Sequence, residues 1–159
     1  MKSTQKIMLA AAAILAIAAV ALFLIPALRT PGLTLSDQES GRVFARYPLE
    51  DGESFSVTFR HSVNKSDVTE IYQRRGREIW LTGCVYYSFG AGVAEELDPS
   101  WVLSYGENGE MILSNIELRM DDLNYVVGTV YDHILKIGDE IVVLNALCGK
   151  NAKVHFSID

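Results

Sequence analysis

Hydrophobic residues follow two patterns along the chain, one continuous and one alternating. Residues 7–28 read IMLAAAAILAIAAVALFLIPAL, an apolar run of 22 residues without a charge. Beyond residue 40, apolar and polar residues alternate with a period of two, as at Phe55, Val57 and Phe59. A continuous run of this length is typical of a membrane-spanning helix, whereas alternation is typical of half-buried β-strands.

The apolar run predicts one transmembrane helix. As a helix it is roughly 33 Å long, enough to cross the hydrocarbon core of a bilayer. Lys2 and Lys6 precede the run, so residues 1–6 are expected to stay in the cytoplasm and the rest of the chain to lie outside the inner membrane. A cleaved secretory signal is the alternative, because Ala19-Val20-Ala21 fits a small-x-small cleavage site.

Short strands separated by turn residues predict an all-β domain over residues 41–159. Residues 29–40 are polar and contain Pro31 and Gly32, so they are expected to form a linker. Asn108-Gly109 is a strong hairpin signal. The expected strands lie near residues 55–61, 68–73, 79–89, 101–105, 111–114, 116–120, 125–131, 140–146 and 153–158. Without crossover helices, this pattern favours an antiparallel sandwich or a small barrel of about eight or nine short strands.

The charge balance of this domain argues against nucleic acid as a partner. All 20 acidic residues lie beyond residue 29, against 11 of the 14 basic residues, which gives a net charge of 11 − 20 = −9. Nucleic-acid-binding domains instead carry clustered Lys and Arg. The acidic surplus indicates a soluble domain.

Cys84 and Cys148 are the only cysteines in the sequence. Outside the cytoplasm the two thiols can pair, and closing a loop of about 64 residues would stabilise the fold by several kcal/mol. The alternative is two buried free cysteines that act as small apolar residues. The sequence leaves both interpretations open.

The densest polar stretch, residues 61–70, connects two expected strands. Ser62 and Lys65 match a Ser-x-x-Lys motif, which requires a helix that a strand-to-strand connection does not supply. His61, Ser62 and Glu70 form a candidate catalytic set, although the sequence has no G-x-S-x-G motif. The residues favour a simpler interpretation, a hairpin in which His61 and Ser62 satisfy backbone groups.

Histidine and glycine supply two further hypotheses. His61, His133 and His155 with Glu70 are the candidate metal ligands, but no two histidines stand at motif spacing. No metal or other cofactor is therefore expected. Glycines in the segment Ser88-Phe89-Gly90-Ala91-Gly92 allow either a tight turn, the simpler interpretation, or a nest of backbone amides for an anion.

Three blocks of polar and glycine residues follow one another along the chain. The first is His61-Ser62-Val63 with Lys65, Val68 and Glu70, the second is Ser88 with Gly90 and Gly92, and the third is Val127-Gly128 with His133 and Leu135. In this order they resemble the family called domain of unknown function 1850, over roughly residues 40–158.

The resemblance implies a small bacterial protein, secreted or membrane-anchored, whose gene often stands beside tripartite ATP-independent periplasmic (TRAP) transporters of the TAXI type. It implies a non-enzymatic accessory protein without catalytic residues, in contact with the transporter membrane subunits or the solute receptor. The residues that it favours as a shared surface are His61, Ser62, Glu70, Gly90, Gly92 and His133. A small-molecule or metal-binding domain around His61, Glu70 and His133 is the second hypothesis, and a hydrolase is the third.

Overall fold

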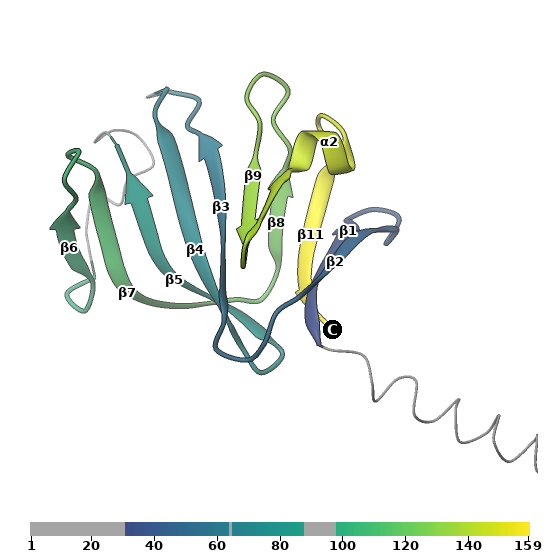
Figure 1. The fold of residues 1–159 in the computed structure, drawn as a ribbon, viewed down its shortest axis with the longest axis horizontal. Helices are drawn as coiled ribbons and strands as arrows, with labels where there is room; N and C mark the ends of the chain where they lie inside the picture. The colour runs from purple at the N-terminus through teal and green to yellow at the C-terminus, as the bar shows by residue number, and fades with distance from the viewer. Residues whose placement is uncertain (1–30, 64, 88–97) are drawn as a thin grey trace, which may run out of the picture. The chain divides into compact units, whose positions relative to one another are not determined.

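The computed structural model describes residues 31–63, 65–87 and 98–159 (Figure 1). The predicted transmembrane segment, residues 7–28, and the cytoplasmic tip before it lie outside these ranges. Within them, no helix has the length and apolar character needed to cross a membrane.

Two antiparallel sheets account for the eleven strands of the described residues. The four-stranded sheet has the order β2-β1-β11-β8, from β1 (Gly32–Asp37), β2 (Val43–Pro48), β8 (Leu123–Val126) and β11 (Lys153–Ile158). The seven-stranded sheet has the order β10-β9-β3-β4-β5-β7-β6, from β3 (Ser54–Arg60), β4 (Asp67–Arg75), β5 (Glu78–Tyr86), β6 (Val102–Tyr105), β7 (Met111–Met120), β9 (Ile134–Ile137) and β10 (Glu140–Val143). The all-β prediction is confirmed, with more strands than expected.

Buried residues of both sheets share one hydrophobic core. Leu33, Leu35 and Phe156 of the four-stranded sheet lie in the same cluster as Phe55 and Tyr72 of the seven-stranded sheet. The Phe55 ring stacks on Tyr72 with centroids 5.2 Å apart and on Phe156 at 6.1 Å. Because the sheets remain separate and face each other across this core, the fold is a sandwich.

The predicted linker over residues 29–40 is wrong for most of its length. Gly32–Asp37 form β1, which pairs with β2 and β11. Leu33 and Leu35 are fully buried, and the compact domain begins at Pro31 rather than at residue 41. Two leucines among polar residues are too short a pattern to reveal a strand whose partner β11 lies more than 100 residues away.

The hairpin expected at Asn108-Gly109 is present, with Gly109 in the left-handed region at φ +82°. The strands expected at 111–114 and 116–120 are one strand, β7, interrupted at Asn115, where φ is +61°. The register between β5 and β7 shifts here, between Leu81 and Gly83 of β5.

Two expected strands end early. The strand expected over 125–131 stops at Val126, and the one expected over 140–146 stops at Val143 and becomes a short helix, α2 (Leu144–Cys148). The Leu144 amide donates to the His133 carbonyl oxygen at 2.9 Å, and the Leu144 side chain is fully buried. This hydrogen bond extends the pairing of β10 with β9 by one residue, and the chain turns into α2 at that point.

Candidate functional site

Glu70 lies on the inner face of the seven-stranded sheet, towards the shared core. Its cross-strand neighbours are Val57 on β3 and Cys84 on β5, and the same row continues to Leu135 on β9 and Leu113 on β7. Those four neighbours are buried. A carboxylate in such a row is costly unless hydrogen-bond donors compensate it.

Two tyrosines supply these donors, one from each sheet. The Tyr72 hydroxyl donates to Glu70 Oε2 at 2.9 Å, and the Tyr125 hydroxyl, which comes from β8 in the opposite sheet, donates to the same oxygen. Burial, and then the charge of Glu70, raises the pKa of the Tyr72 hydroxyl well above its ordinary value. Burial and both neighbours raise the pKa of Tyr125 as well. Both hydroxyls therefore stay protonated and available as donors. We call Glu70, Tyr72 and Tyr125 the Glu70 cluster.

The hydrogen bonds of the Glu70 cluster connect the two sheets. The two hydroxyl oxygens are also only 2.7 Å apart. The cluster therefore has three close oxygen pairs, and when the carboxylate is ionised only the two hydroxyl protons are available for hydrogen bonds between them. The carboxylate, as the charged acceptor, makes the stronger bonds. A tyrosine hydroxyl with a raised pKa is almost entirely protonated at neutral pH, and the three side chains cross-link the two sheets.

His133 lies beside this cluster. Its ring stacks on Phe59 with centroids 5.5 Å apart and planes at 13°, and the Tyr125 ring meets it edge-on at 6.1 Å. Its Nδ1 accepts a hydrogen bond from the Gly128 amide at 3.1 Å, which assigns the proton of the neutral ring to Nε2. Burial lowers the pKa of His133, against the charges of Asp132 and Glu70, so the ring is neutral at pH 7.

The loop that carries His133 is held by Gly128 and Asn145. A Cβ on Gly128 would clash with the Tyr131 carbonyl oxygen and press on the His133 ring. The Asn145 side chain of α2 accepts a hydrogen bond from the His133 amide at 3.3 Å and donates to the Gly128 carbonyl oxygen at 3.0 Å. The third sequence block is therefore a structural unit that fixes the imidazole.

The two cysteines are free thiols, which is a correction to the pairing that the sequence left open. Cys84 is buried beside Leu113 and Ile116, whereas Cys148 packs on the main core from α2. Burial raises the pKa of each thiol to about 11. Both therefore act as small apolar side chains with little thiolate at neutral pH.

The loop between β3 and β4 carries His61, Ser62 and Lys65. The Lys65 amide donates to the His61 carbonyl oxygen at 3.0 Å, and the His61 amide donates to the Ser66 carbonyl oxygen at 2.8 Å. Lys65 has φ +54°, and Ser62 and Lys65 are exposed. The Ser-x-x-Lys pair thus lies in a turn rather than on a helix, which removes the geometry that the motif requires.

The structure brings Glu70 and His133 together through Tyr125. Ser88, Gly90 and Gly92 lie outside the described residues, and His155 lies apart on β11, with Nδ1 3.1 Å from Asn124 Oδ1. Among the described residues no three His, Cys, Asp or Glu side chains are arranged to hold a metal ion. Neither Tyr72 nor Tyr125 was predicted as a site residue, and the only signal for Tyr72 was its position two residues from Glu70, on the same side of an alternating strand.

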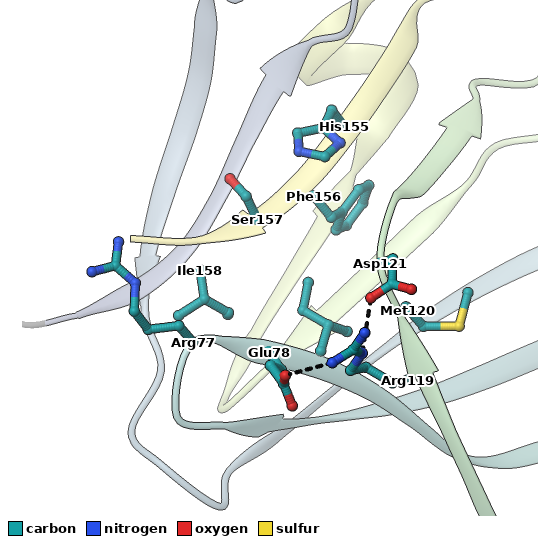
Figure 2. A pocket seen from close by; sticks show the side chains of 10 residues that line it. Arg77, Glu78, Arg119, Met120, Asp121, His155, Phe156, Ser157 and Ile158 are labelled. Atoms are coloured by element: carbon teal, nitrogen blue, oxygen red, sulfur yellow. Dashed lines mark hydrogen bonds and ion pairs between the residues drawn. The ribbon is translucent and has the colours of Figure 1, made fainter.

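A pocket of about 230 Å³ opens beside the start of β8, where the last residues of β11 have no partner on that side (Figure 2). Arg119 lies at one side of it and pairs with Glu78 at 3.1 Å and with Asp121 at 2.8 Å. Arg77 lines the pocket too, and its guanidinium makes no hydrogen bond or ion pair with any described residue. Phe156 and Ile158 supply apolar surface.

Comparison with known proteins places this chain in a family. The model of a domain of unknown function, DUF1850, matches residues 55–144, which are 90 of the 159 residues. The matched span runs from the second residue of β3 to the first residue of α2 and so contains β8 and all of the seven-stranded sheet except Ser54. No curated protein and no solved structure matches the chain. The protein belongs to the family of domain of unknown function 1850.

Proposed function

We propose that this protein is a non-enzymatic accessory protein of a TRAP-type (TAXI) solute uptake system. Residues 7–28 anchor it in the inner membrane, and its β-sandwich lies on the extracytoplasmic side. The partner is a transporter membrane subunit or the solute receptor. The link to this transport system comes from the resemblance described above.

The chemistry around Glu70 supports a binding protein rather than an enzyme. Glu70 Oε2 accepts a hydrogen bond from each tyrosine hydroxyl, and the Nδ1 of His133 accepts one from the Gly128 amide, so the lone pairs of these two atoms are taken up. A general base needs a free lone pair within reach of a substrate proton. These groups instead use their hydrogen-bonding capacity to hold the sandwich together.

The observation that carries the proposal is an exposed apolar surface where β3 and β9 meet their loops. This loop end comprises residues 60–63, 65, 66 and 127–133. Val63 is 66% exposed, Val130 is 79% exposed and Tyr131 is 45% exposed. The Arg60 guanidinium lies over the Tyr131 ring at 5.0 Å, which joins the two loops. Apolar side chains that gather on a surface rimmed by polar groups are typical of a protein-binding site.

Affinity purification of the tagged full-length chain from native membranes tests this proposal. We expect TRAP-type subunits to co-purify with the wild-type chain and their recovery to fall at least about fivefold with Val130→Glu, a loss of about 1 kcal/mol. Ile141→Glu is the matched control, because Ile141 is an exposed aliphatic residue on β10, 70% exposed, away from these loops.

Two results would contradict the proposal. Absence of TRAP-type subunits from the wild-type preparation would remove the transporter association, and equal recovery with Val130→Glu would remove the loop end as the contact. A reporter fused to the C-terminus tests the topology separately, because activity confined to the cytosol would contradict the anchor.

The pocket in Figure 2 favours a second candidate function, binding of a small organic carboxylate. The unpaired Arg77 guanidinium would hold the carboxylate, and Phe156 and Ile158 would contact a short apolar chain. Thermal unfolding with millimolar short-chain carboxylates tests it. A rise in Tm that Arg77→Ala abolishes would support this function, and no rise with any of them would exclude it.

A further inference from the structure

The outer face of the seven-stranded sheet, the face turned away from the core, has an unusual composition. Two adjacent rows of residues cross all seven strands on this face. The first row is Val143, Ile134, Thr58, Thr69, Val85, Ile112 and Ser104, and the second is Ile141, Lys136, Ser56, Ile71, Gly83, Ser114 and Val102. The order of β9, β3, β4, β5, β7 and β6 can be followed in Figure 1.

Lys136 is the only charged residue among these fourteen positions. Seven of the others are Val or Ile, five are Ser or Thr and one is Gly. Charged residues make up 21% of the chain, which would place about three on fourteen average positions, and solvent-facing positions normally carry more than the average. We call these two rows the neutral face.

The hydroxyl groups of the neutral face are partly satisfied within it. The Thr58 and Thr69 hydroxyls are 2.8 Å apart and hydrogen-bonded to each other. Ser104 and Ser114 direct their hydroxyls to backbone carbonyl oxygens of the neighbouring strand at 3.4 Å. Covering this surface therefore removes few hydrogen bonds to water, which lowers the cost of burial.

Charges border the neutral face at both ends of the strands. Arg60 and Asp67 lie opposite each other on β3 and β4 beyond one row. Beyond the other row, Arg75 forms an ion pair with Glu117, and Arg119 pairs with Glu78. An uncharged centre with a charged rim is the usual anatomy of a protein interface.

The neutral face also has a knob and a hollow. A shallow hollow of about 310 Å³ lies over β9, β3 and β4 and is lined by Ser56, Ile71 and Lys136 among others. Ile141, in the same row on the edge strand β10, is 70% exposed. A knob and a hollow on one surface are self-complementary when two copies meet about a two-fold axis.

We propose that the neutral face binds a second copy of this chain, with Ile141 of each copy placed in the hollow of the other. Seven strands at about 4.8 Å and two rows of about 7 Å each give a face of about 34 by 14 Å, roughly 950 Å² for the two copies. With the rim added, this area reaches the range of about 1,000 Å² and more that a specific interface needs.

Charge also favours a second copy on this face. Residues 30–159 carry nine more acidic than basic side chains, so most approaches between two copies are repulsive. The neutral face is a broad surface of the sheet on which two copies meet with little repulsion.

Sedimentation of the full-length chain in mild detergent tests the proposal. We expect a dimer whose dissociation constant rises at least about tenfold with Ile141→Glu and stays unchanged with Val130→Glu, an equally exposed aliphatic residue on a loop. A photoreactive residue at Ser56 is expected to cross-link to a second copy in native membranes, whereas one at Val126, on the edge of the other sheet, is not.

Three results would overturn the proposal. They are a monomer at all accessible concentrations, a dimer that Ile141→Glu leaves unchanged, and cross-linking from Ser56 to a different protein. The transporter association is judged independently, because Ile141→Glu is expected to dissociate the dimer while TRAP-type subunits still co-purify.

Discussion

The inner and outer faces of the seven-stranded sheet are built by alternate residues of the same strands, yet they distribute ionisable groups in opposite ways. The inner face, which borders the core, contains Glu70 and Cys84 in one row, with His133 at the loop next to it. The outer face has Lys136 alone in two complete rows. Ionisable groups lie where donors and acceptors are arranged for them, and solvent access by itself does not attract them.

This contrast has an energetic meaning. Glu70 remains inside because hydroxyl groups from both sheets converge on it, and such a contact ties the sheets together. The neutral face contributes little to the stability of a single protomer. The free-energy cost of exposing its apolar side chains to water is relieved when a second surface covers them. Substitutions on the two faces should therefore differ in stability and in association.

The largest expected effect is on the inner face. Tyr72→Ala removes a buried ring that stacks on Phe55 and removes one donor to Glu70, so we expect a loss of about 3–5 kcal/mol in the free energy of unfolding. Urea unfolding of the full-length chain, followed by tryptophan fluorescence, measures it. Ile71→Ala, one position away on the outer face, is the control. An equal loss in its free energy of unfolding would contradict the expected difference between the two faces.

A smaller loss is expected from Tyr125→Phe. This change keeps the ring and leaves Glu70 with a single tyrosine donor, which should cost about 1–3 kcal/mol. A double-mutant cycle with Glu70→Gln isolates the bond between the sheets. Additive losses in that cycle would show that the two side chains do not interact energetically.

The third expected effect depends on pH. Burial holds the folded-state pKa of His133 below its ordinary value of 6.5, so the unfolded chain binds more protons as the pH falls below about 6.5. The stability that comes from the neutral imidazole is therefore complete above this value and is lost as the pH falls towards the folded-state pKa. Urea midpoints between pH 7.5 and 5.5 should fall less steeply in His133→Gln, and parallel profiles would contradict the assignment.

The smallest expected effect is that of Ile141→Glu on the protomer. The side chain is 70% exposed on an edge strand, so the free energy of unfolding at concentrations below the dimer range should change by no more than about 0.5 kcal/mol. Urea unfolding of dilute protein checks this value. A larger loss would mean that Ile141 supports the protomer itself, and the test of dimerisation would then need a different substitution.

The candidate site was only partly predictable from the sequence. Alternation on β4 placed Glu70 on the same side as Val68 and Tyr72, and the structure agrees. The second donor, Tyr125, is 55 residues away and on the other sheet. A local pattern contains no information on which distant hydroxyl group meets a carboxylate.

The sequence by itself determined the strand-rich class of this domain, the hairpin at Asn108-Gly109 and the residues that share a face within each strand. These features depend on local backbone preferences and on a period of two, which neighbouring residues specify. Only the tertiary structure decided that Gly32–Asp37 is a strand, that β10 ends in α2, and that the two cysteines lie apart as free thiols. Each of these depends on contacts between residues far apart in the chain, such as the pairing of β1 with β11, and the free energy of those contacts overrides weak local signals.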